Sequence, residues 1–210
     1  MKQDHLSTTN AHARVRAWIE KKGRYRFVSH LGMVVILRRA VIRSKLPVLF
    51  SKGFHPLPRF SFGPALRVGF ESRGEPVDIY LAAVFDPETV KEQLNQELPE
   101  DLKVRRVDIL DQDSKKCAAA FKYVTAEVTF AVDGLLELTG SSVRRQVPSF
   151  DAEIIDFSPI PDTGMIPDCA WYRARIVLPA ALTSKVEEII RDVIGGRAIT
   201  KLRVVRESFE

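Results

Sequence analysis

The sequence predicts an α+β protein built from a ferredoxin-like βαββαβ unit, with two such units in tandem. Three observations lead to this prediction. Apolar residues recur with strand and helix periods, in the order strand, helix, strand, strand, helix, strand, between residues 14 and 110. A similar order returns between residues 121 and 210. The 210 residues are 45% hydrophobic, which is enough to bury two small cores or one large core.

The first predicted unit begins with alternating apolar residues at 14–19, a pattern typical of a strand, and continues with a helix at 31–46. Ser29 precedes this helix and can accept a hydrogen bond from its first turn, and Pro47 ends it. Residues 51–64 contain three prolines and two glycines, so we expect an ordered loop without regular structure there.

The rest of this unit follows from similar signals. Strands are expected at 65–70 and 77–85. Asp86-Pro87-Glu88 then starts a second helix, and a strand at 104–110 closes the unit. Residues 111–120 are polar and alanine-rich, which predicts a linker between a basic domain at 14–110 and a second domain at 121–210.

The second predicted unit has strands at 123–132, 153–159 and 171–178 and a last strand at 199–205. Its clearest helix spans 184–194, with Thr183 as the cap and Gly195-Gly196 at the end. The other helix of the unit, expected within 134–147, has only a weak signal. A single larger α+β domain is therefore the alternative to the tandem arrangement.

The composition indicates where the protein is expected to be located and which cofactors it can bind. No apolar run approaches the roughly 18 residues of a membrane span, and the first 13 residues are polar, so we expect a cytoplasmic protein with no membrane partner. Cys117 and Cys169 are far apart and form no Cys-x-x-Cys pair, so they cannot ligate an iron–sulfur cluster. We expect no metal and no cofactor.

Positive charge is concentrated in residues 14–67. This segment holds thirteen Lys or Arg and one acid, Glu20, a net charge of +12, whereas the rest of the chain sums to −7. Such a cluster attracts polyanions, and interleaved aromatic residues such as Tyr25 and Phe60 can stack on exposed bases. The alternative is that the aromatics belong to the core and the charges form an ordinary solvated face. The candidate RNA- or anion-binding residues are Arg24, Arg26, Arg38, Arg39, Arg43, Lys52, Arg59 and Arg67.

Several short runs between residues 24 and 81 form a consecutive pattern. They are Arg26-Phe27-Val28-Ser29-His30-Leu31, Arg38-Arg39-Ala40, Leu46-Pro47, Phe50-Ser51-Lys52-Gly53-Phe54-His55-Pro56-Leu57-Pro58 and Ser61-Phe62-Gly63-Pro64-Ala65-Leu66, followed by Gly69, Ser72, Glu75 and Asp78. This pattern resembles the radical SAM-linked protein family, which carries domain of unknown function 2344. The resemblance implies a protein found beside or fused to a radical SAM protein. Its motif loop would consist of Ser29, His30, Ser51, Gly53, Phe54, His55, Pro56 and Ser61.

This chain departs from the family pattern at Gly32, where the family favours Asp. An acid at position 32 would form a reciprocal helix cap with Ser29, and Gly also weakens the first turn. Capping or positioning is therefore the favoured role of that acid, and catalysis is the alternative.

His30 and His55 are the candidate catalytic residues. Two imidazoles could act as general base and general acid in a metal-independent endoribonuclease, with Arg or Lys stabilising the phosphorane. The favoured alternative is that His30 hydrogen-bonds at a helix start and His55 packs in a loop. Tandem ferredoxin-like domains are similar to the RAMP arrangement of CRISPR RNA-processing endonucleases, but in fold only. Nearby carboxylates, those of Glu71, Glu75 and Asp78, are expected to be solvated.

The absence of a phosphate-binding Gly-x-x-x-x-Gly-Lys-Ser/Thr loop and of a Gly-x-Ser-x-Gly elbow favours a role without catalysis. The leading hypothesis is an accessory protein that binds tRNA or another structured RNA for a radical SAM modification partner. A protein-interaction subunit that docks the radical SAM enzyme through its basic face is the second hypothesis. The endoribonuclease is the third.

Overall fold

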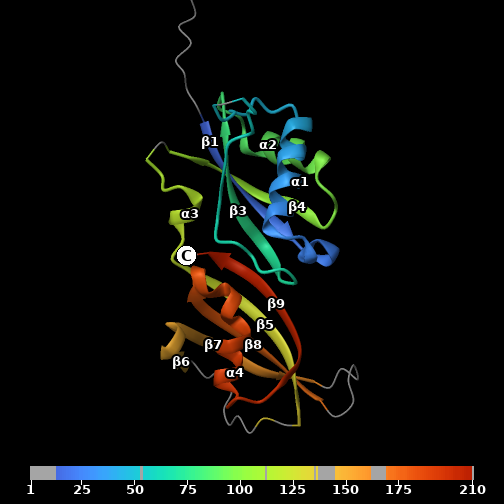
Figure 1. The fold of residues 1–210 in the computed structure, drawn as a ribbon, viewed down its shortest axis with the longest axis vertical. Helices are drawn as coiled ribbons and strands as arrows, with labels where there is room; N and C mark the ends of the chain where they lie inside the picture. The colour runs from blue at the N-terminus through green and yellow to red at the C-terminus, as the bar shows by residue number, and fades with distance from the viewer. Residues whose placement is uncertain are drawn as a thin grey trace, which may run out of the picture.

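The structure is organised around one sheet that runs the length of the molecule. The computed structural model describes residues 13–52, 54–111, 113–134, 136, 145–161 and 169–209. Within these residues the nine strands are β1 (Ala13–Lys21), β2 (Phe60–Phe62), β3 (Glu71–Leu81), β4 (Leu102–Leu110), β5 (Tyr123–Asp133), β6 (Arg145–Val147), β7 (Ala152–Ile160), β8 (Cys169–Pro179) and β9 (Ile199–Phe209). The sheet is mostly antiparallel, in the order β4-β1-β3-β9-β5-β8-β7-β6, and β2 pairs with β3 beside this path (Figure 1).

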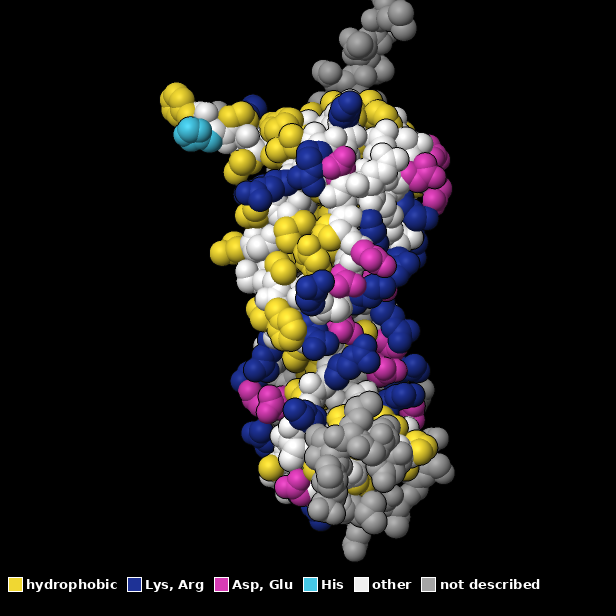
Figure 2. Space-filling view, turned by 90° about the vertical axis from the view of Figure 1, so that its right-hand side faces the viewer, with side chains coloured by type: hydrophobic (Ala, Val, Ile, Leu, Met, Phe, Trp, Pro, Cys, Tyr) yellow, Lys and Arg dark blue, Asp and Glu magenta, His cyan; other side chains and the backbone are white. Residues whose placement is uncertain are grey.

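The helices divide between the two ends of this sheet. In the described residues the α-helices are α1 (His30–Arg43), α2 (Pro87–Glu97), α3 (Cys117–Ala120) and α4 (Val186–Val193), and the 3-10 helices are η1 (Gly23–Phe27), η2 (Pro148–Phe150) and η3 (Ala180–Lys185). The molecule is elongated, with a first half of β1 to β4 and a second half of β5 to β9 stacked along the long axis (Figures 1 and 2). None of the described helices is long and apolar enough to cross a membrane.

The core of the first half lies between the sheet and two helices. Val15 and Ile19 point to one face of β1 because side chains alternate along a strand. Leu37 and Val41 lie four residues apart on the buried face of α1, and Leu94 of α2 joins the same cluster. Both helices therefore cover one face of β1, β3 and β4.

Two of the predicted helix starts are confirmed. The Ser29 hydroxyl accepts a hydrogen bond from the backbone N–H of Gly32 (3.1 Å), and the Asp86 carboxylate accepts one from Thr89 (3.0 Å). The first helix ends three residues earlier than predicted, because the backbone turns into the left-handed region at Lys45 (φ 59°).

The strand predicted at 65–70 is wrong. The strand that precedes β3 is β2, which is only three residues long, and 65–70 is irregular. Leu66 and Phe70 leave the first half and pack into the core of the second half. Gly69 adopts a φ of 92° in this segment, and its N–H donates to the carbonyl of Arg26 (2.8 Å). Contact between the halves therefore overrides the local apolar pattern.

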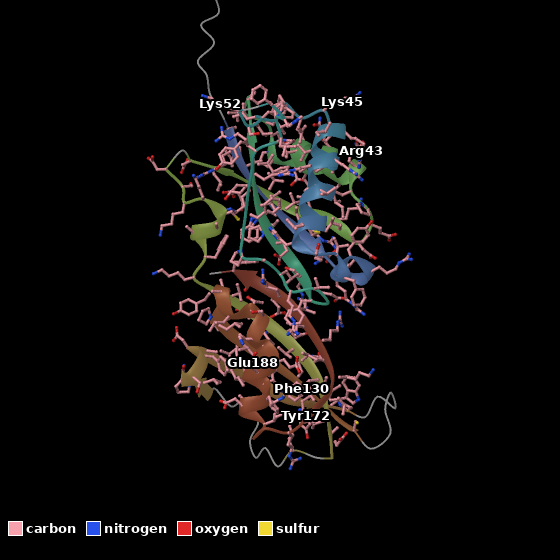
Figure 3. All side chains as sticks on the ribbon, viewed as in Figure 1. Arg43, Lys45, Lys52, Phe130, Tyr172 and Glu188 are labelled. Atoms are coloured by element: carbon pink, nitrogen blue, oxygen red, sulfur yellow. The ribbon has the colours of Figure 1, made fainter. Side chains whose placement is uncertain are left out.

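The core of the second half is built on β5, β8 and α4. The rings of Phe130 and Tyr172 stack with centroids 5.8 Å apart in this core (Figure 3), and Ile189 and Ile190 of α4 cover it. Of the helix expected within 134–147, residues 137–144 lie outside the described residues, and 145–147 form β6. Thr183 does not cap α4; its hydroxyl donates to the carbonyl of Ala180 within η3 (2.9 Å).

The three carboxylates of β3 are not solvated, so that expectation is wrong. Neighbouring segments enclose these side chains: the backbone N–H of Cys117 contacts Asp78, and the guanidinium groups of Arg26 and Arg203 contact Glu71. Asp78 is completely buried, and Glu71 is nearly so. Each carboxylate is neutralised by an arginine. The ion pairs are Asp78 with Arg16 (2.7 Å), Glu75 with Arg206 (3.0 Å) and Glu71 with Arg203 (2.7 Å).

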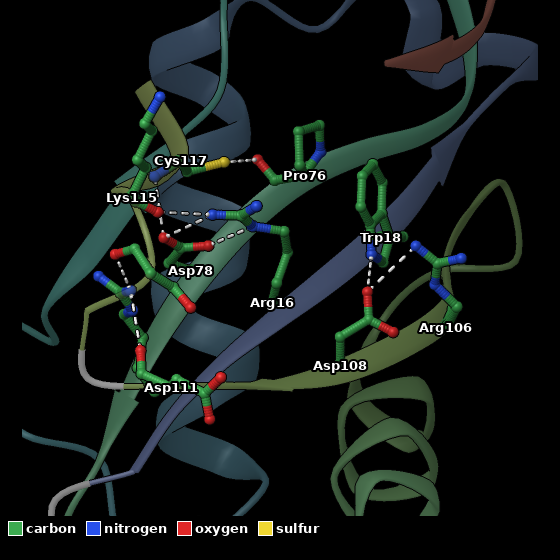
Figure 4. A network of polar contacts seen from close by, with 11 residues as sticks. Arg16, Trp18, Pro76, Asp78, Arg106, Asp108, Asp111, Lys115 and Cys117 are labelled. Carbon is green, nitrogen blue, oxygen red and sulfur yellow. Dashed lines mark hydrogen bonds and ion pairs between the residues drawn. The ribbon is translucent and has the colours of Figure 1, made fainter. Parts of the chain in front are cut away.

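The segment at 113–120 folds against the face of β1 and β3 that α1 and α2 leave uncovered. The backbone N–H of Cys117 donates to the Asp78 carboxylate (2.9 Å), and the Arg16 guanidinium donates to the carbonyl of Lys115 (3.1 Å) (Figure 4). Cys117 is completely buried, and its thiol donates to the carbonyl of Pro76 (3.1 Å). The segment is thus fixed by hydrogen bonds to a buried ion pair.

Candidate nucleic-acid interface

A groove of about 590 Å³ lies where the two halves meet. It is bounded by the end of η1, the turn at 67–70 and the first residues of β9. Figure 2 shows Lys and Arg side chains, mixed with Asp and Glu, around this waist. The lining residues include Arg26, Phe27, Arg67, Trp171, Lys201 and Arg203. The volume falls within the roughly 300–1,000 Å³ of ligand sites.

The groove continues onto an open face of the second half. Val128 and Phe130 of β5 point into the core, so the alternate residue Thr129 points to the opposite face. The same alternation applies to β8 and β9, which pair with β5 on its two sides. Two cross-strand rows on this open face are Arg173, Thr129 and Arg203, and Trp171, Ala131 and Lys201. Arg173, Lys201 and Arg203 are all exposed.

Two aromatic side chains accompany this positive charge. Trp171 is half-buried, and its indole N–H has no hydrogen-bond partner within the described residues. An unsatisfied buried donor costs about 1–3 kcal/mol, which a ligand oxygen could recover. Phe27 is exposed at the other side of the groove, and the Arg26 guanidinium lies 4.7 Å from the centre of its ring. Both rings offer faces on which a planar ligand can stack.

Glu71 positions two of the arginines in the groove. Its carboxylate accepts hydrogen bonds from Arg26 (3.2 Å) and Arg203 (2.7 Å), which come from opposite halves of the molecule. Burial by itself would raise the pKa of Glu71, but hydrogen bonds and charge from Arg203 and Arg26 hold that pKa below its ordinary value. One carboxylate between two guanidinium groups leaves a net positive charge at the junction.

The predicted basic residues are spread over separate surfaces of the molecule. Arg26 and Arg67 line the groove. Arg38, Arg39 and Arg43 belong to α1, where Arg43 forms an ion pair with Glu97 (2.6 Å). Figure 3 shows Arg43 and Lys52 at the end of the first half that is far from Glu188 and Tyr172.

The remaining two predicted residues, Arg24 and Arg59, lie outside the groove. Arg24 is exposed at η1 and lines a second hollow that also contains Glu100 and Asp101. Arg59 is exposed, and its guanidinium lies 4.6 Å from the centre of the Tyr80 ring. The structure therefore does not gather the positive segment into one binding surface.

The two candidate histidines lie at opposite ends of α1. His30 is its first residue and packs edge-on against Phe62, with ring centroids 5.2 Å apart. His55 is exposed in the loop that follows the helix. A helix of 14 residues is about 20 Å long, so one phosphate cannot contact both imidazoles. The structure does not bring together the pair that a two-histidine nuclease requires.

Other motif-loop residues shape the backbone. The Ser51 hydroxyl accepts a hydrogen bond from the backbone N–H of Leu57 (3.0 Å), and Ser61 lies opposite Asp78 in the pairing of β2 with β3. Phe54 and Pro56 are exposed, and Gly53 lies outside the described residues. These positions therefore fix a projecting loop instead of lining a pocket.

A small cavity of about 30 Å³ lies between α1, β2 and β3. Lys21, His30 and Glu75 line it, and the Lys21 ammonium donates to the carbonyl of Val28 (2.8 Å). Burial lowers the pKa of Lys21, and Arg206 lowers it further, while Glu75 opposes the shift. The space suits a water molecule and is too small for a nucleotide.

Most basic and aromatic residues of this candidate interface lie outside the positive segment at 14–67, so the charge pattern did not identify them. A signal was nevertheless present in the sequence. Trp171, Arg173 and Arg175 alternate along one predicted strand, and Lys201 and Arg203 alternate along another. A period of two with basic and aromatic residues predicts a charged open sheet face.

Among the described residues, no group of three or more His, Cys, Asp or Glu is arranged to hold a metal ion. The fold and the groove define a mixed α/β protein with a long, mostly antiparallel sheet and a positively charged junction. The chain belongs to the family described as "Uncharacterized protein conserved in bacteria (DUF2344)", whose model matches residues 14–154. No curated protein sequence matches this chain.

Among solved structures, the chain is similar to "an Unknown Protein from Galdieria sulphuraria". The match covers 93% of this chain and 98% of that chain, with 11% sequence identity and a TM-score of 0.27. A likeness this weak has no bearing on fold or function.

Proposed function

We propose that this protein binds unpaired segments of a structured RNA, such as tRNA, in the groove at the junction and on the open face of β8, β5 and β9. The observation that carries the proposal is that Trp171 and Lys201 flank Ala131 of β5 in one cross-strand row, next to the row that holds Arg173 and Arg203. The leading hypothesis from the sequence is retained, with Arg26 and Arg67 kept in the site, but the other binding residues move from the positive segment at 14–67 to the second half.

The chemistry of these side chains suits single-stranded RNA. An unpaired base can stack on the indole of Trp171 or on the ring of Phe27, which is exposed. Lysine and arginine beside the rings can neutralise the phosphates that flank such a base. The indole N–H of Trp171 offers a hydrogen bond to a base or phosphate oxygen.

The connectivity gives further support, because each half can be interpreted as a ferredoxin-like unit. The first half has the strand order β4-β1-β3-β2, and the second half has β9-β5-β8-β7. When the three-residue β6, which pairs with β7, is set aside, both halves have the same order: the fourth strand in the chain, then the first, the third and the second. A four-stranded sheet whose open face presents aromatic and basic residues is a common platform for RNA. Fold alone does not establish function, so the proposal depends on the side chains.

The family resemblance motivates the second part of the proposal, in which the RNA is presented to a radical SAM partner. Only two cysteines are present, so this chain would act as an accessory to cluster chemistry carried out elsewhere. The endoribonuclease hypothesis has no supporting observation, because its two histidines lie at opposite ends of α1.

The test is binding of purified protein to tRNA, to a single-stranded RNA and to duplex DNA across a salt series. If Arg173, Lys201 and Arg203 each neutralise one phosphate of single-stranded RNA, the affinity should fall about 18-fold between about 50 and 200 mM salt. Trp171→Ala should weaken RNA binding by about 5- to 150-fold, from the roughly 1–3 kcal/mol of one base stack.

A matched pair of variants separates this face from general positive charge. Arg173→Glu with Lys201→Glu should abolish RNA binding, whereas Arg39→Glu with Lys45→Glu, the same charge change on exposed residues of the first half, should leave it within about threefold. Equal loss in both double variants, or no RNA binding at about 50 mM salt, would show that the open face is not the RNA site.

A further inference from the structure

The first helix is apolar on two opposite faces. Its inner face buries Met33, Leu37 and Val41. On the other side, three large aliphatic residues are exposed to solvent, namely Leu31 (75% exposed), Val35 (43%) and Ile42 (56%). They lie within about 40° of one another around the helix axis, because successive residues rotate by about 100°. A helix that is apolar on both sides is normally covered on both sides.

The loop at 50–57 extends this apolar surface beyond the end of α1. Phe50 is bridged to Pro58, and the backbone N–H of Ser51 donates to the carbonyl of Leu57 (2.8 Å), so the base of the loop is held as a narrow hairpin. Phe54 is fully exposed near its tip, and the loop projects from the body of the molecule (Figure 2). An aromatic ring held out in this way suits insertion into a pocket of another molecule.

Unpaired positive charge accompanies these apolar residues. Arg38 lies on the same line of α1 as Val35 and Ile42, and its guanidinium Nε is buried without a hydrogen-bond partner in the described part of the chain. Arg39 and Lys52 are exposed and form no ion pair with a described carboxylate. A partner that covers this surface must supply acceptors for these cations.

The charges select among possible occupants. A second copy of the chain would bring the same cations together across a two-fold interface, which is unfavourable. Insertion of α1 into a lipid bilayer would carry Arg38, in the middle of the apolar stripe, toward the hydrocarbon. A folded protein can place a carboxylate opposite Arg38 and apolar pockets opposite its neighbours.

We propose that the outer face of α1 and the loop residues 50–52 and 54–57 together dock a protein whose contact surface is apolar at its centre and carries carboxylates at its rim. Leu31, Ile42 and Phe54 are the apolar anchors. Arg38, Arg39 and Lys52 bind the partner's acidic groups. This surface is distinct from the RNA face, so the protein would hold an acidic partner at one end and RNA at the junction and second half.

The test uses a defined probe, a fluorescent amphipathic helical peptide of about five turns with leucines on one face and glutamates elsewhere. Its counterpart with lysine in place of glutamate is the charge control. The acidic peptide should bind the full chain and the lysine peptide should not. Ile42→Glu should weaken binding by at least about tenfold, and Arg38→Glu should do the same. Ile109→Glu, at an exposed isoleucine of β4 (50% exposed), is the matched control and should have no effect.

Other results would overturn the proposal. They are failure of the acidic peptide to bind at millimolar concentration, equal effects of Ile42→Glu and Ile109→Glu, or self-association in sedimentation that Ile42→Glu abolishes. Binding to vesicles with about one-third phosphatidylserine, lost in Ile42→Glu, would identify a membrane surface instead. Loss of tRNA binding in Ile42→Glu would assign this face to RNA, whereas tRNA binding that persists without peptide binding would leave the proposed RNA function intact.

Discussion

Replacement of Asp78 by Asn tests whether the buried ion pair at the centre of the first half stabilises the fold. The Asp78 carboxylate is completely buried and accepts hydrogen bonds from Arg16 Nε (2.7 Å), from the Arg16 terminal nitrogen (3.2 Å) and from the backbone N–H of Cys117 (2.9 Å). The amide keeps the size of the side chain but removes its charge. The Arg16 guanidinium is then left buried without a counter-ion.

The expected cost follows from these contacts. Loss of one partner of a buried ion pair costs about 3–5 kcal/mol. The Arg16 guanidinium keeps its hydrogen bond to the carbonyl of Lys115 and its position 5.0 Å from the Phe121 ring, so the lower value of about 3 kcal/mol is appropriate. For a chain of 210 residues this corresponds to a decrease in Tm of about 6–12 °C.

Thermal and urea unfolding measure this cost, and the Cys117 thiol reports on the site itself. If the ion pair holds the 111–120 segment in place, Asp78→Asn should make Cys117 reactive toward a thiol reagent in the folded protein. Adding Arg16→Met to Asp78→Asn should recover at least about 1 kcal/mol, because the uncompensated charge is removed. A decrease in Tm of less than about 2 °C together with an unreactive Cys117 would refute the reasoning.

Three further predictions concern single side chains. Burial and the charge of Asp78 raise the pKa of Cys117 to about 12, so at about pH 8 iodoacetamide should modify only Cys169 in the native protein, and mass spectrometry should find Cys117 modified only after unfolding. Gly32→Ala should lower the Tm although alanine favours helices, because its Cβ would lie 2.7 Å from Val28 Cγ1. A higher Tm in Gly32→Ala, with Val28 unchanged, would contradict this steric explanation. The lowered pKa of Glu71 stabilises the fold above the ordinary pKa of about 4.3, and this stability is lost as the pH falls through the pKa of the folded state. Glu71→Gln should therefore reduce the decrease in the free energy of unfolding, measured with urea, as the pH is lowered. The same pH dependence in the variant and the original protein would refute the assignment.

Much of the secondary structure could be predicted because it is encoded locally. The caps at Ser29 and Asp86 hydrogen-bond to residues three positions later, so short sequence windows contain both partners. The alternation in β5 and β8 also lies within single strands. The failure at 65–70 has the opposite cause, since Leu66 and Phe70 are buried by the other half of the chain and no local pattern contains that contact.

The candidate site was predicted only in part. Arg26 and Arg67 were identified from charge, and the structure places both in the groove. Charge density could not distinguish them from Arg43, which lies on α1 outside the groove and pairs with Glu97 of α2. Arg26 and Arg67 also form ion pairs, with Glu71 and Glu187, so what separates them from Arg43 is their position in the fold, and composition does not contain that information.

The sequence by itself determined the periodic elements, the capped helices and the excess of positive charge in the first half. Only the tertiary structure decided that Trp171 of β8 lies across β5 from Lys201 of β9, and that Glu71 joins Arg26 to Arg203. The physical reason is that strand order and register are set by burial of one face of each strand against a shared core. Side chains on the opposite face are therefore brought together as a consequence of packing that no single segment specifies.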